Sequence, residues 1–563
     1  MTLTLNPGFV PIIAALLVLA LPRAFRPPVM AGAGLVALWL LLDHEFGAAA
    51  AMAQMGLPVV LLNLDALNRI FGVALLLALT AIAIYSSGRR NRYEDAAILL
   101  LAGGAVSALF VGDLVSFVAA TSLAGLTGAW CVFASPLTGA ERSGVRVLIW
   151  HGIEGLLFLI GVALLLSAGR EASVFARLEV TSWGGGFLFA ALMVRIGAPL
   201  AHVWLKDAVS HASPAGAAAL TVFSPMLGVY ALARFFPAEP LLVEIGAAMI
   251  LLGAAFAVAE DDLRRGAMYA LMTQIGACVA LIGLGSPLAH AAAQGHVFST
   301  IFVYLGAVMC LGAVIERRGE ARVSALTGLS ARMPVTAGLW TLAVLALAAM
   351  PGFASYATQS VVLEAAAQAD LQWLWLLFAA APAVIFAGLG LRPLLAMFRP
   401  SETQGGRDEA PFSFLLGAVL VVFFCFAVGV APRWLYGLMP TELTFAPFAL
   451  DRVARQFETL GAAGLVFVLL EAAGATLRER NVRLLDADAF YRGPMAAAGR
   501  WSGSVLSRIY AAWGAGAGAA SRAGARALQA IVQRGDRPYQ QPLAAAAQLL
   551  AVGVLAAIAM LLR

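Results

Sequence analysis

Long apolar stretches follow one another along almost the whole chain, and they restrict its fold more than any other feature. We count roughly sixteen of them, and a hydrocarbon core about 30 Å thick needs about 20 apolar residues per crossing helix. Of the 563 residues, 62% are hydrophobic and 12% are charged, which is too little charge for a surface that faces water. A helix pairs its own backbone N–H and C=O groups, which lipid cannot do. We therefore predict an all-α polytopic membrane protein with about 14–16 transmembrane helices.

Glycine, proline and charged residues separate the apolar stretches and give their expected bounds. In the first half the spans cover residues 8–21, 29–46, 66–87, 95–111, 113–134, 146–167, 183–204 and 215–236. In the second half they cover residues 241–259, 267–285, 288–314, 334–366, 371–398, 411–431, 457–477 and 541–562. No basic region precedes the first stretch, so we expect a retained span there and not a cleaved signal.

The distribution of arginine predicts the orientation of the chain. Loops after odd-numbered spans hold most of the arginines and even-numbered loops hold few, and short cytoplasmic loops are those that carry positive charge. Both termini are then expected outside the cytoplasm, in a multi-pass protein of the cell inner (plasma) membrane, surrounded by lipid. The same rule explains the net charge of +5, so no nucleic-acid partner is expected.

The sequence contains no pattern typical of an enzyme that acts alone. The four cysteines stand singly in apolar runs, without the spacing of a disulfide framework or a zinc site. Phosphate-binding glycine loops, nucleophile elbows, and haem or iron–sulfur motifs are absent from the sequence. We expect no cofactor and no metal, and any redox catalysis would lie in partner subunits.

The segment between the last two spans is not a soluble domain. Trp501, Val505, Ile509 and Trp513 recur in it at helical spacing among scattered arginines, a pattern typical of an amphipathic helix at a membrane surface. We interpret it as cytoplasmic. The alternative is a mobile Ala/Gly-rich tether to the final span.

Two spans are interrupted at comparable places, the seventh by Pro199 and the twelfth by Pro351-Gly352. Paired broken helices indicate internal repeats. Where the backbone inside the membrane is not helical, its N–H and C=O groups must bond to other protein groups or to water in a cavity. The two breaks therefore point to an ion path. A packing kink is the alternative for either break alone.

Three motifs carry a family resemblance. Residues 195–236 read RIGAPLAHVWLKDAVSHASPAGAAALTVFSPMLGVYALARFF, residues 262–276 read DLRRGAMYALMTQIG, and residues 485–492 read LDADAFYR. In this order they resemble the proton-conducting antiporter-like membrane subunits of Mrp-type Na+/H+ antiporters and of respiratory complex I, the NADH:quinone oxidoreductase. The resemblance extends over nearly the whole chain.

The resemblance implies two inverted five-helix repeats with broken helices 7 and 12, and a line of charged residues across the membrane midplane. Protons or cations would move along that line. The expected partners are other membrane subunits of a hetero-oligomeric complex, with H+, and Na+ or K+ as further candidate ions. The expected parts are N-terminal helices (1–94), a first repeat (95–236), a second repeat (237–398), C-terminal helices (399–483), the amphipathic segment (484–540) and a final helix (541–563).

The chain departs from the family at the positions that bear charge. Arg195 falls on the family's helix-seven lysine, and Lys206, the only lysine in the sequence, replaces the proline of its WLPDA string. A buried lysine exchanges a proton readily, whereas a guanidinium stays charged. Other family lysines or glutamates are replaced by uncharged residues, namely Ser122, Met226, Ser299 and Gln359.

Glu154 and Arg195 are the main candidates for a remaining polar path. His151 and Glu154 share one face of the sixth span, since they are three residues apart. At 1.5 Å per residue, Glu154 and Arg195 reach a similar depth from opposite sides of the membrane. We expect the two to pair in place of the missing helix-five partnership, either as part of a proton relay or as a fixed structural salt bridge.

Further ionisable residues gather at the seventh-span break. His202, Lys206, Asp207 and His211 are candidates for a cytoplasm-side proton entry, and the alternative is a loop in which Asp207 caps the next helix. His296, in the polar patch GHVFST, is a third relay candidate. We expect Asp261, Asp262, Arg264 and Arg265 to form a solvated ion-pair cluster at a helix end.

Three functions are compatible with these features. The first is a membrane subunit of a multisubunit cation/proton antiporter or complex I-like assembly that contributes to proton or Na+ translocation. The second is a degenerate, non-conducting subunit that keeps the helical scaffold for assembly, because of the four lost charges. The third is the membrane partner of an inorganic-carbon uptake complex.

Overall fold

A computed structural model describes residues 5–505, except for residues 48, 55–56, 89–90, 171–172, 175–176, 401–407, 440–444, 475–486, 496, 498–499 and 502. The chain divides into two compact units, residues 1–481 and residues 482–563. In the second unit the structure describes a short helix, α21 (Ala487–Phe490), followed by a π-helical turn, Tyr491–Met495. The expected span 541–562 and most of the expected amphipathic segment 484–540 lie outside the described residues.

Helices make up most of the first unit. Those that precede the first break are α1 (Phe9–Ala20), α2 (Arg26–Asp43), α3 (Ala66–Ser86), α4 (Arg92–Phe110), α5 (Leu114–Phe133), α6 (Ala140–Ser167) and α7 (Trp183–Arg195). Next come α8 (Val203–His211), α9 (Pro214–Phe235), α10 (Leu241–Ala259), α11 (Leu263–Leu284), α12 (Pro287–Arg318), α13 (Leu329–Arg332) and α14 (Pro334–Leu347). The last are α15 (Ala354–Gln368), α16 (Gln372–Ile385), a π-helical segment Phe386–Leu391, α17 (Arg392–Phe398), α18 (Phe412–Val430), α19 (Pro432–Tyr436) and α20 (Leu450–Ala472).

The helices agree with the predicted polytopic class. Among the described residues, twelve helices are long and apolar enough to cross a membrane, and α1, α7 and α14 are shorter apolar helices. With each broken helix counted once, they account for fifteen of the expected spans. The breaks fall where prolines interrupt the hydrophobic pattern, between α7 and α8 and between α14 and α15.

One element was not predicted. The strands β1 (Ala49–Gln54) and β2 (Leu57–Asn63) form an antiparallel hairpin between α2 and α3, in a stretch that the all-α expectation left as a loop. The hairpin contacts the start of α5: the amide of Val60 donates a hydrogen bond to Asp113 Oδ2 at 2.8 Å. The strands are short, and no alternation of polar and apolar residues distinguishes them from a loop next to a span.

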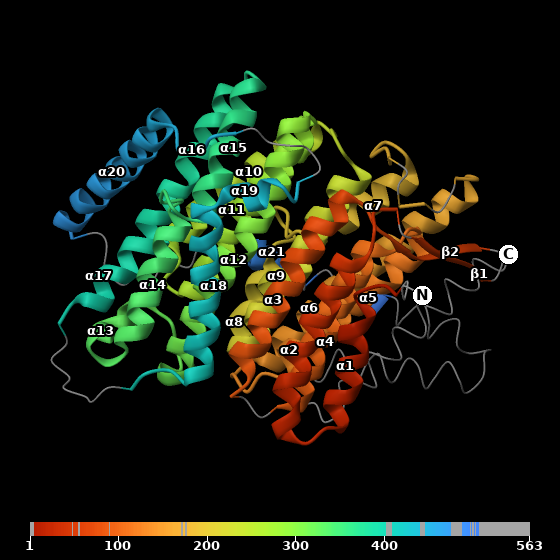
Figure 1. Cartoon of the computed structure of the whole chain (residues 1–563), viewed down its shortest axis with the longest axis horizontal. Coiled ribbons are helices and arrows are strands. Elements are labelled where there is room, and N and C mark those ends of the chain that lie inside the picture. The colour runs from red at the N-terminus through yellow and green to blue at the C-terminus, as the bar shows by residue number, and fades with distance from the viewer. Residues whose placement is uncertain are drawn as a thin grey trace. The chain divides into compact units, whose positions relative to one another are not determined.

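The centre of the bundle is formed by α9 and α12, whose apolar stretches are entirely buried. Figure 1 shows them between the N-terminal helices on one side and α14 to α18 on the other. α12 contacts α9 and α3 across this centre, and it contacts α14, α15 and α18 on its other side. A 32-residue helix is about 48 Å long at 1.5 Å per residue, so α12 extends past the hydrocarbon core.

The two broken helices end in the same way. After α7, the amide of Gly197 donates to the carbonyl three residues earlier, and that of Ala198 to the carbonyl five residues earlier. After α14, Ala349 and Met350 repeat both hydrogen bonds. This is the Schellman closure, and its left-handed residue is Gly197 (φ 67°) in one case and Ala349 (φ 51°) in the other.

The matching closures align the two repeats residue by residue at the breaks. Arg195 and Leu347 are the last helical residues of α7 and α14, and each is followed four positions later by a proline, Pro199 or Pro351. The helices before them also correspond. Asp113 and Asp262 both cap the next helix through their side chains, and both form an isolated antiparallel bridge further along the chain, with Ser173 and Arg322.

Close helix packing gives a test of this fold. A side-chain carbon added at Gly276 of α11 would lie 2.7 Å from the carbonyl oxygen of Gly246 in α10, whereas one added at Gly338 of α14 meets nothing within 4 Å. We expect Gly276→Val to lower the free energy of unfolding by about 1–3 kcal/mol through overpacking. Gly338→Val makes the same change of side chain within a helix, with the same change in helix propensity, and serves as the control. Thermal denaturation in detergent that gives equal midpoints for both variants would contradict this packing.

Candidate functional site

Three ionisable side chains meet inside the first repeat, and we call His151, Glu154 and Arg195 the first-repeat cluster. Glu154 Oε1 accepts a hydrogen bond from Arg195 Nε, and Glu154 Oε2 lies 2.7 Å from His151 Nδ1. Glu154 is 1% exposed and Arg195 is 2% exposed. The structure therefore brings together the two residues whose depths the sequence places at one level. Their role in transport stays a hypothesis.

Each of the two terminal nitrogens of Arg195 also has a hydrogen-bond partner. One terminal nitrogen donates to Ser224 Oγ at 3.0 Å, and the other donates to the carbonyl of Thr121 at 2.9 Å. A buried charge is tolerated when it is both paired and fully hydrogen-bonded. The sequence did not point to Ser224 and Thr121, because a hydroxyl and a carbonyl on apolar helices give no signal of their own.

His151 is bonded on one side only. Its Nδ1 faces the Glu154 carboxylate, so Nδ1 carries the proton when Glu154 is ionised and Nε2 has a bare lone pair. Nε2 is buried and has no hydrogen-bond partner among the described residues. The ring lies edge-on to Trp204, with centroids 4.6 Å apart, and Trp204 is itself fixed by a 2.7 Å hydrogen bond to the carbonyl of Val194.

The residues expected at the seventh-span break separate into two groups. His202 and Lys206 face Tyr269 of α11, with the Lys206 ammonium 5.7 Å from its ring centre and the His202 ring centre at 5.8 Å. These three residues line a cavity of about 10 Å³ together with Gly197, Leu205, Met268 and Met272. The shared helical face of His202 and Lys206 is thus seen in the structure.

The second group faces α6. Asp207 accepts a hydrogen bond from Arg146 Nε, and His211 Nδ1 lies 2.9 Å from the backbone oxygen of Asp207. The hydroxyl of Ser143 donates to that same oxygen at 2.9 Å. Ser213, and not Asp207, caps α9. The alternative in which Asp207 caps the next helix is therefore wrong, since Asp207 lies inside α8 and pairs with Arg146.

Arg264 corrects a second expectation. Arg265 and Asp262 are partly exposed, in line with a solvated cluster, but Arg264 is 4% exposed. Its guanidinium donates to the carbonyls of Val209 and Ala212. It thereby satisfies the C-terminal carbonyls of α8, the helix that carries Lys206. Local sequence does not indicate which of two adjacent arginines turns inward.

A second polar group lies in the second repeat, around His296. His296 Nε2 is 2.7 Å from Gln274 Oε1 and Nδ1 is 3.3 Å from Thr358 Oγ1. Ser299 Oγ is 2.7 Å from the same Thr358 oxygen. Gln274 and Thr358 were not among the predicted site residues. We call His296, Gln274, Ser299 and Thr358 the second-repeat network.

The four substituted family positions have four different surroundings. Ser122 lies next to Gly155, where an added side-chain carbon would be 3.7 Å from its hydroxyl, and Ser299 belongs to the second-repeat network. Gln359 donates from Nε2 to the carbonyl of Phe378 at 2.7 Å. Met226 is 1% exposed and lies among apolar side chains.

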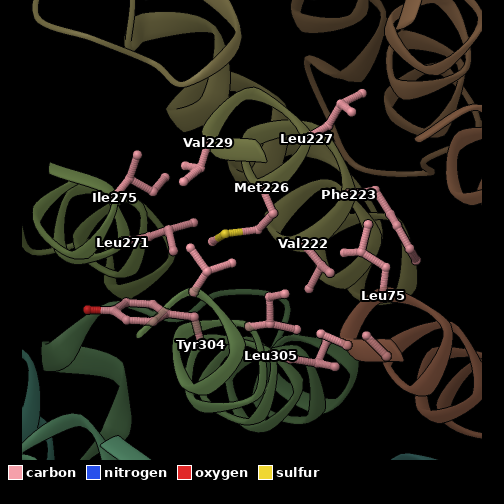
Figure 2. Close-up of a cluster of buried hydrophobic side chains, with 14 of the residues drawn as sticks. Leu75, Val222, Phe223, Met226, Leu227, Val229, Leu271, Ile275, Tyr304 and Leu305 are labelled. Atoms are coloured by element: carbon pink, nitrogen blue, oxygen red, sulfur yellow. The ribbon is translucent and has the colours of Figure 1, made fainter. Parts of the chain in front are cut away.

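Figure 2 shows the surroundings of Met226. Its thioether points between α9, α11 and α12, toward Leu271 and the ring of Tyr304. The same group includes Leu75, Val222, Phe223, Leu227, Val229, Ile275 and Leu305, and we call these residues with Met226, Leu271 and Tyr304 the apolar cluster. Met226 stands two residues after Ser224, which bonds Arg195. Apolar side chains therefore surround Met226, the residue that the resemblance aligns with the family's helix-eight lysine.

Comparison with known proteins agrees with this arrangement. Residues 137–384 match the family described as NADH:quinone oxidoreductase/Mrp antiporter, TM, a range that runs from α6 to α16 and holds both breaks and the His151, Glu154, Arg195 and His296 side chains. These residues are similar to the antiporter-like family. The chain is accordingly a multi-pass membrane protein with an antiporter-like segment.

Relatives of this family are similar over part of their length. The chain is 31% identical over 258 residues to NADH-quinone oxidoreductase subunit L of Mycobacterium tuberculosis (strain CDC 1551 / Oshkosh), covering 43% of this chain and 40% of that protein. It is 28% identical over 307 residues to NADH-quinone oxidoreductase subunit N of Desulforudis audaxviator (strain MP104C), covering 50% and 60%. The chain thus spans about half the length of these curated relatives.

Solved structures of the same fold cover more of the chain. A chain of the Mrp complex from Dietzia sp. DQ12-45-1b aligns with a TM-score of 0.68 at 17% identity, over 83% of this chain and 100% of that chain. A chain of respiratory complex I from Thermus thermophilus aligns with a TM-score of 0.69 at 21% identity, over 82% and 100%. Both neighbours come from multisubunit membrane complexes, and at these identities the likeness concerns the fold.

The ion pair predicts a pattern of stability. Removing one partner of a buried pair leaves an uncompensated charge and costs about 3–5 kcal/mol, while replacing both is far less damaging. We expect Glu154→Gln and Arg195→Met each to lower thermal stability strongly, and the double variant to lose less than the sum of the two. Additive losses in a double-mutant cycle would show that the two charges do not interact.

Proposed function

We propose that this chain is a membrane subunit of a multisubunit cation/proton antiporter or complex I-like assembly in the cell inner membrane, and that its first repeat translocates protons. The assembly and the membrane are inferred from the fold neighbours, which belong to such complexes. H+ is the ion that the site supports best, because its ionisable groups are a histidine and a carboxylate. Na+ has no comparable set of oxygen ligands in the first-repeat cluster.

The bare Nε2 of His151 is the observation that carries the proposal. A protonatable nitrogen buried in a membrane helix, hydrogen-bonded through its other nitrogen to a carboxylate, is suited to pass a proton. When Nε2 accepts a proton, the Nδ1 proton can move along the existing hydrogen bond to Glu154 Oε2. His151 is then neutral again, and the transferred proton resides on Glu154.

Arg195 holds the fixed charge in this scheme. Its guanidinium stays protonated, so it stabilises the ionised form of Glu154. The same positive charge favours release of the proton that Glu154 has received. Arg195 also ends α7 at the break, where the backbone changes direction. Neutralising Glu154 weakens its hold on Arg195, which links proton occupancy to the position of the α7 end.

In this proposal protons from the cytoplasm reach the first-repeat cluster by way of α8. Lys206 and His202 border the small cavity beside Tyr269, and a partly desolvated lysine exchanges protons more readily than an arginine. Arg264 holds this helix at its C-terminal end, and Arg146 holds it through Asp207 near its middle. In this proposal Lys206 and His202 deliver protons toward His151, and Asp207 and His211 act through the anchoring of α8.

The apolar cluster favours a second candidate function, a non-conducting subunit that serves assembly. Methionine at position 226 offers no proton-carrying group, and the apolar cluster around it lies next to Ser224 of α9 and includes Tyr304 of α12. A continuous path along the membrane plane is not supported by this arrangement. If the first repeat also fails to conduct, the scaffold role remains.

Proton transport by the intact assembly in proteoliposomes separates the two functions. We expect Glu154→Gln to lower the rate of proton transport by at least about tenfold, since an acid–base group in the path contributes 10²–10⁴ in comparable reactions. Glu364→Gln is the matched control, because Glu364 also pairs with an arginine, Arg452, but at a partly exposed site. Transport that is unchanged in Glu154→Gln, with assembly intact, would establish the scaffold role instead.

A further inference from the structure

The helix α20 lies at the outer edge of the bundle, where Figure 1 shows it in blue at the upper left. It contacts α16 and the π-helical segment that follows α16, and it is long and apolar enough to cross a membrane. Of its residues, all of which the structure describes, Leu460 alone is buried. Most of the α20 surface is therefore not covered by the described part of the chain.

Polar contacts attach one side of α20 to the second repeat. Arg452 Nη2 donates to Glu364 Oε2 at 3.3 Å, and Gln456 Nε2 donates to the carbonyl of Ala348 at 3.0 Å. Ala348 is the C-cap of α14, at the second break. The contact therefore places Gln456 close to the depth of that break, and it leaves the opposite side of α20 free.

Glu458 of α20 lies at membrane depth. It follows two residues after Gln456, which contacts the break. Near the other end of α20, Glu471 accepts a hydrogen bond from Arg399, the C-cap of α17, in a loop expected on the cytoplasmic side. Along the helix Glu458 is about 20 Å from Glu471 at 1.5 Å per residue. Since the hydrocarbon core is about 30 Å thick, Glu458 lies inside it.

The Glu458 carboxylate faces away from the bundle. Glu458 is exposed, and it has no hydrogen-bond or ion-pair partner within the described part of the chain. Arg455, one turn earlier, pairs instead with Asp451 at 2.5 Å. Acidic side chains in membrane helices almost always face the interior of a bundle or a cavity and pair with another group. An outward carboxylate at this depth indicates a surface that another protein covers.

The residues that follow Glu458 on the same side are small or apolar. Gly461, Ala462, Leu465 and Leu469 stand at helical spacing from it, all are exposed, and we call these five residues the outer stripe. A side-chain carbon added at Gly461 meets nothing within 4 Å. Small residues let a second helix approach closely within a membrane. The outer stripe thus combines room for a helix with one negative charge.

We propose that the outer stripe binds a transmembrane helix of a partner subunit, and that this helix carries an arginine or lysine at the depth of Glu458. Charge decides among the candidate occupants. The expected final span 541–562 of this chain has no charged residue. A second copy of the chain would offer Arg455, which already pairs with Asp451, and lipid tails offer no hydrogen-bond donor. The inference rests on the proposed assembly and not on proton transport.

Photo-crosslinking in the intact, purified assembly tests this contact. A benzophenone side chain replaces Leu465, which is 62% exposed, and the matched control replaces Leu156 of α6, which is 55% exposed. We expect the probe at Leu465 to attach to a membrane helix of another subunit. The attached residue should lie within about two helical turns of an arginine or lysine, because Leu465 is about two turns from Glu458. The probe at Leu156 gives the background for an exposed apolar site.

Other crosslinking products would overturn the proposal. These are products with lipid alone, with residues 541–562, or with a second copy of this chain, each obtained from an assembly that still contains its other subunits. A chain that purifies from its membrane without any other subunit would refute the proposed function as well.

Charge reversal tests the ion pair. We expect Glu458→Arg to lower retention of the crosslinked subunit at least about tenfold, because a like charge then faces the basic partner. Replacing that basic residue by glutamate should restore retention. Glu244→Arg is the matched control, since it makes the same charge change at an exposed position in the first turn of α10. Equal retention in the Glu458→Arg and Glu244→Arg variants would show that no basic side chain faces Glu458, and would overturn the proposal.

Discussion

The pairing of Arg195 with Glu154 is the interaction on which the first repeat depends. Arg195 is the last residue of α7, so its position is set by the helix closure, and its three nitrogens bind groups on α5, α6 and α9. A charge buried in this way needs all of these partners. The ion pair therefore fixes the end of the broken helix relative to three neighbouring helices, and it places His151 beside Trp204.

The two repeats share a backbone plan and differ in charge. The Schellman closures, the capping aspartates and the prolines after each break correspond, but Leu347 stands where Arg195 does in the first repeat. The Met226 side chain and its neighbours form an apolar cluster next to Ser224 of the first repeat. We infer that ionic chemistry in this subunit is confined to one repeat, and that the other retains the shape of a site without its charges.

Much of this arrangement was accessible from the sequence. The spans follow from hydrophobic length, and the Glu154–Arg195 contact follows from helix rise, because a regular helix converts residue number into depth. The shared face of His202 and Lys206 follows from helical spacing in the same way. Other features depend on packing between distant segments: the inward turn of Arg264, the partnership of Gln274 with His296, and the hairpin held by Asp113. Nothing in local sequence distinguishes these residues from their neighbours.

Protonation of Glu154 is the event that the account requires, and infrared difference spectroscopy of the intact assembly observes it directly. As pH is lowered, a buried carboxylic acid should give a C=O stretching band that is absent from Glu154→Gln, with an accompanying imidazole change that is absent from His151→Phe. If the bands of the two variants match those of the unmodified protein, Glu154 carries no proton, and the first-repeat cluster is a structural salt bridge.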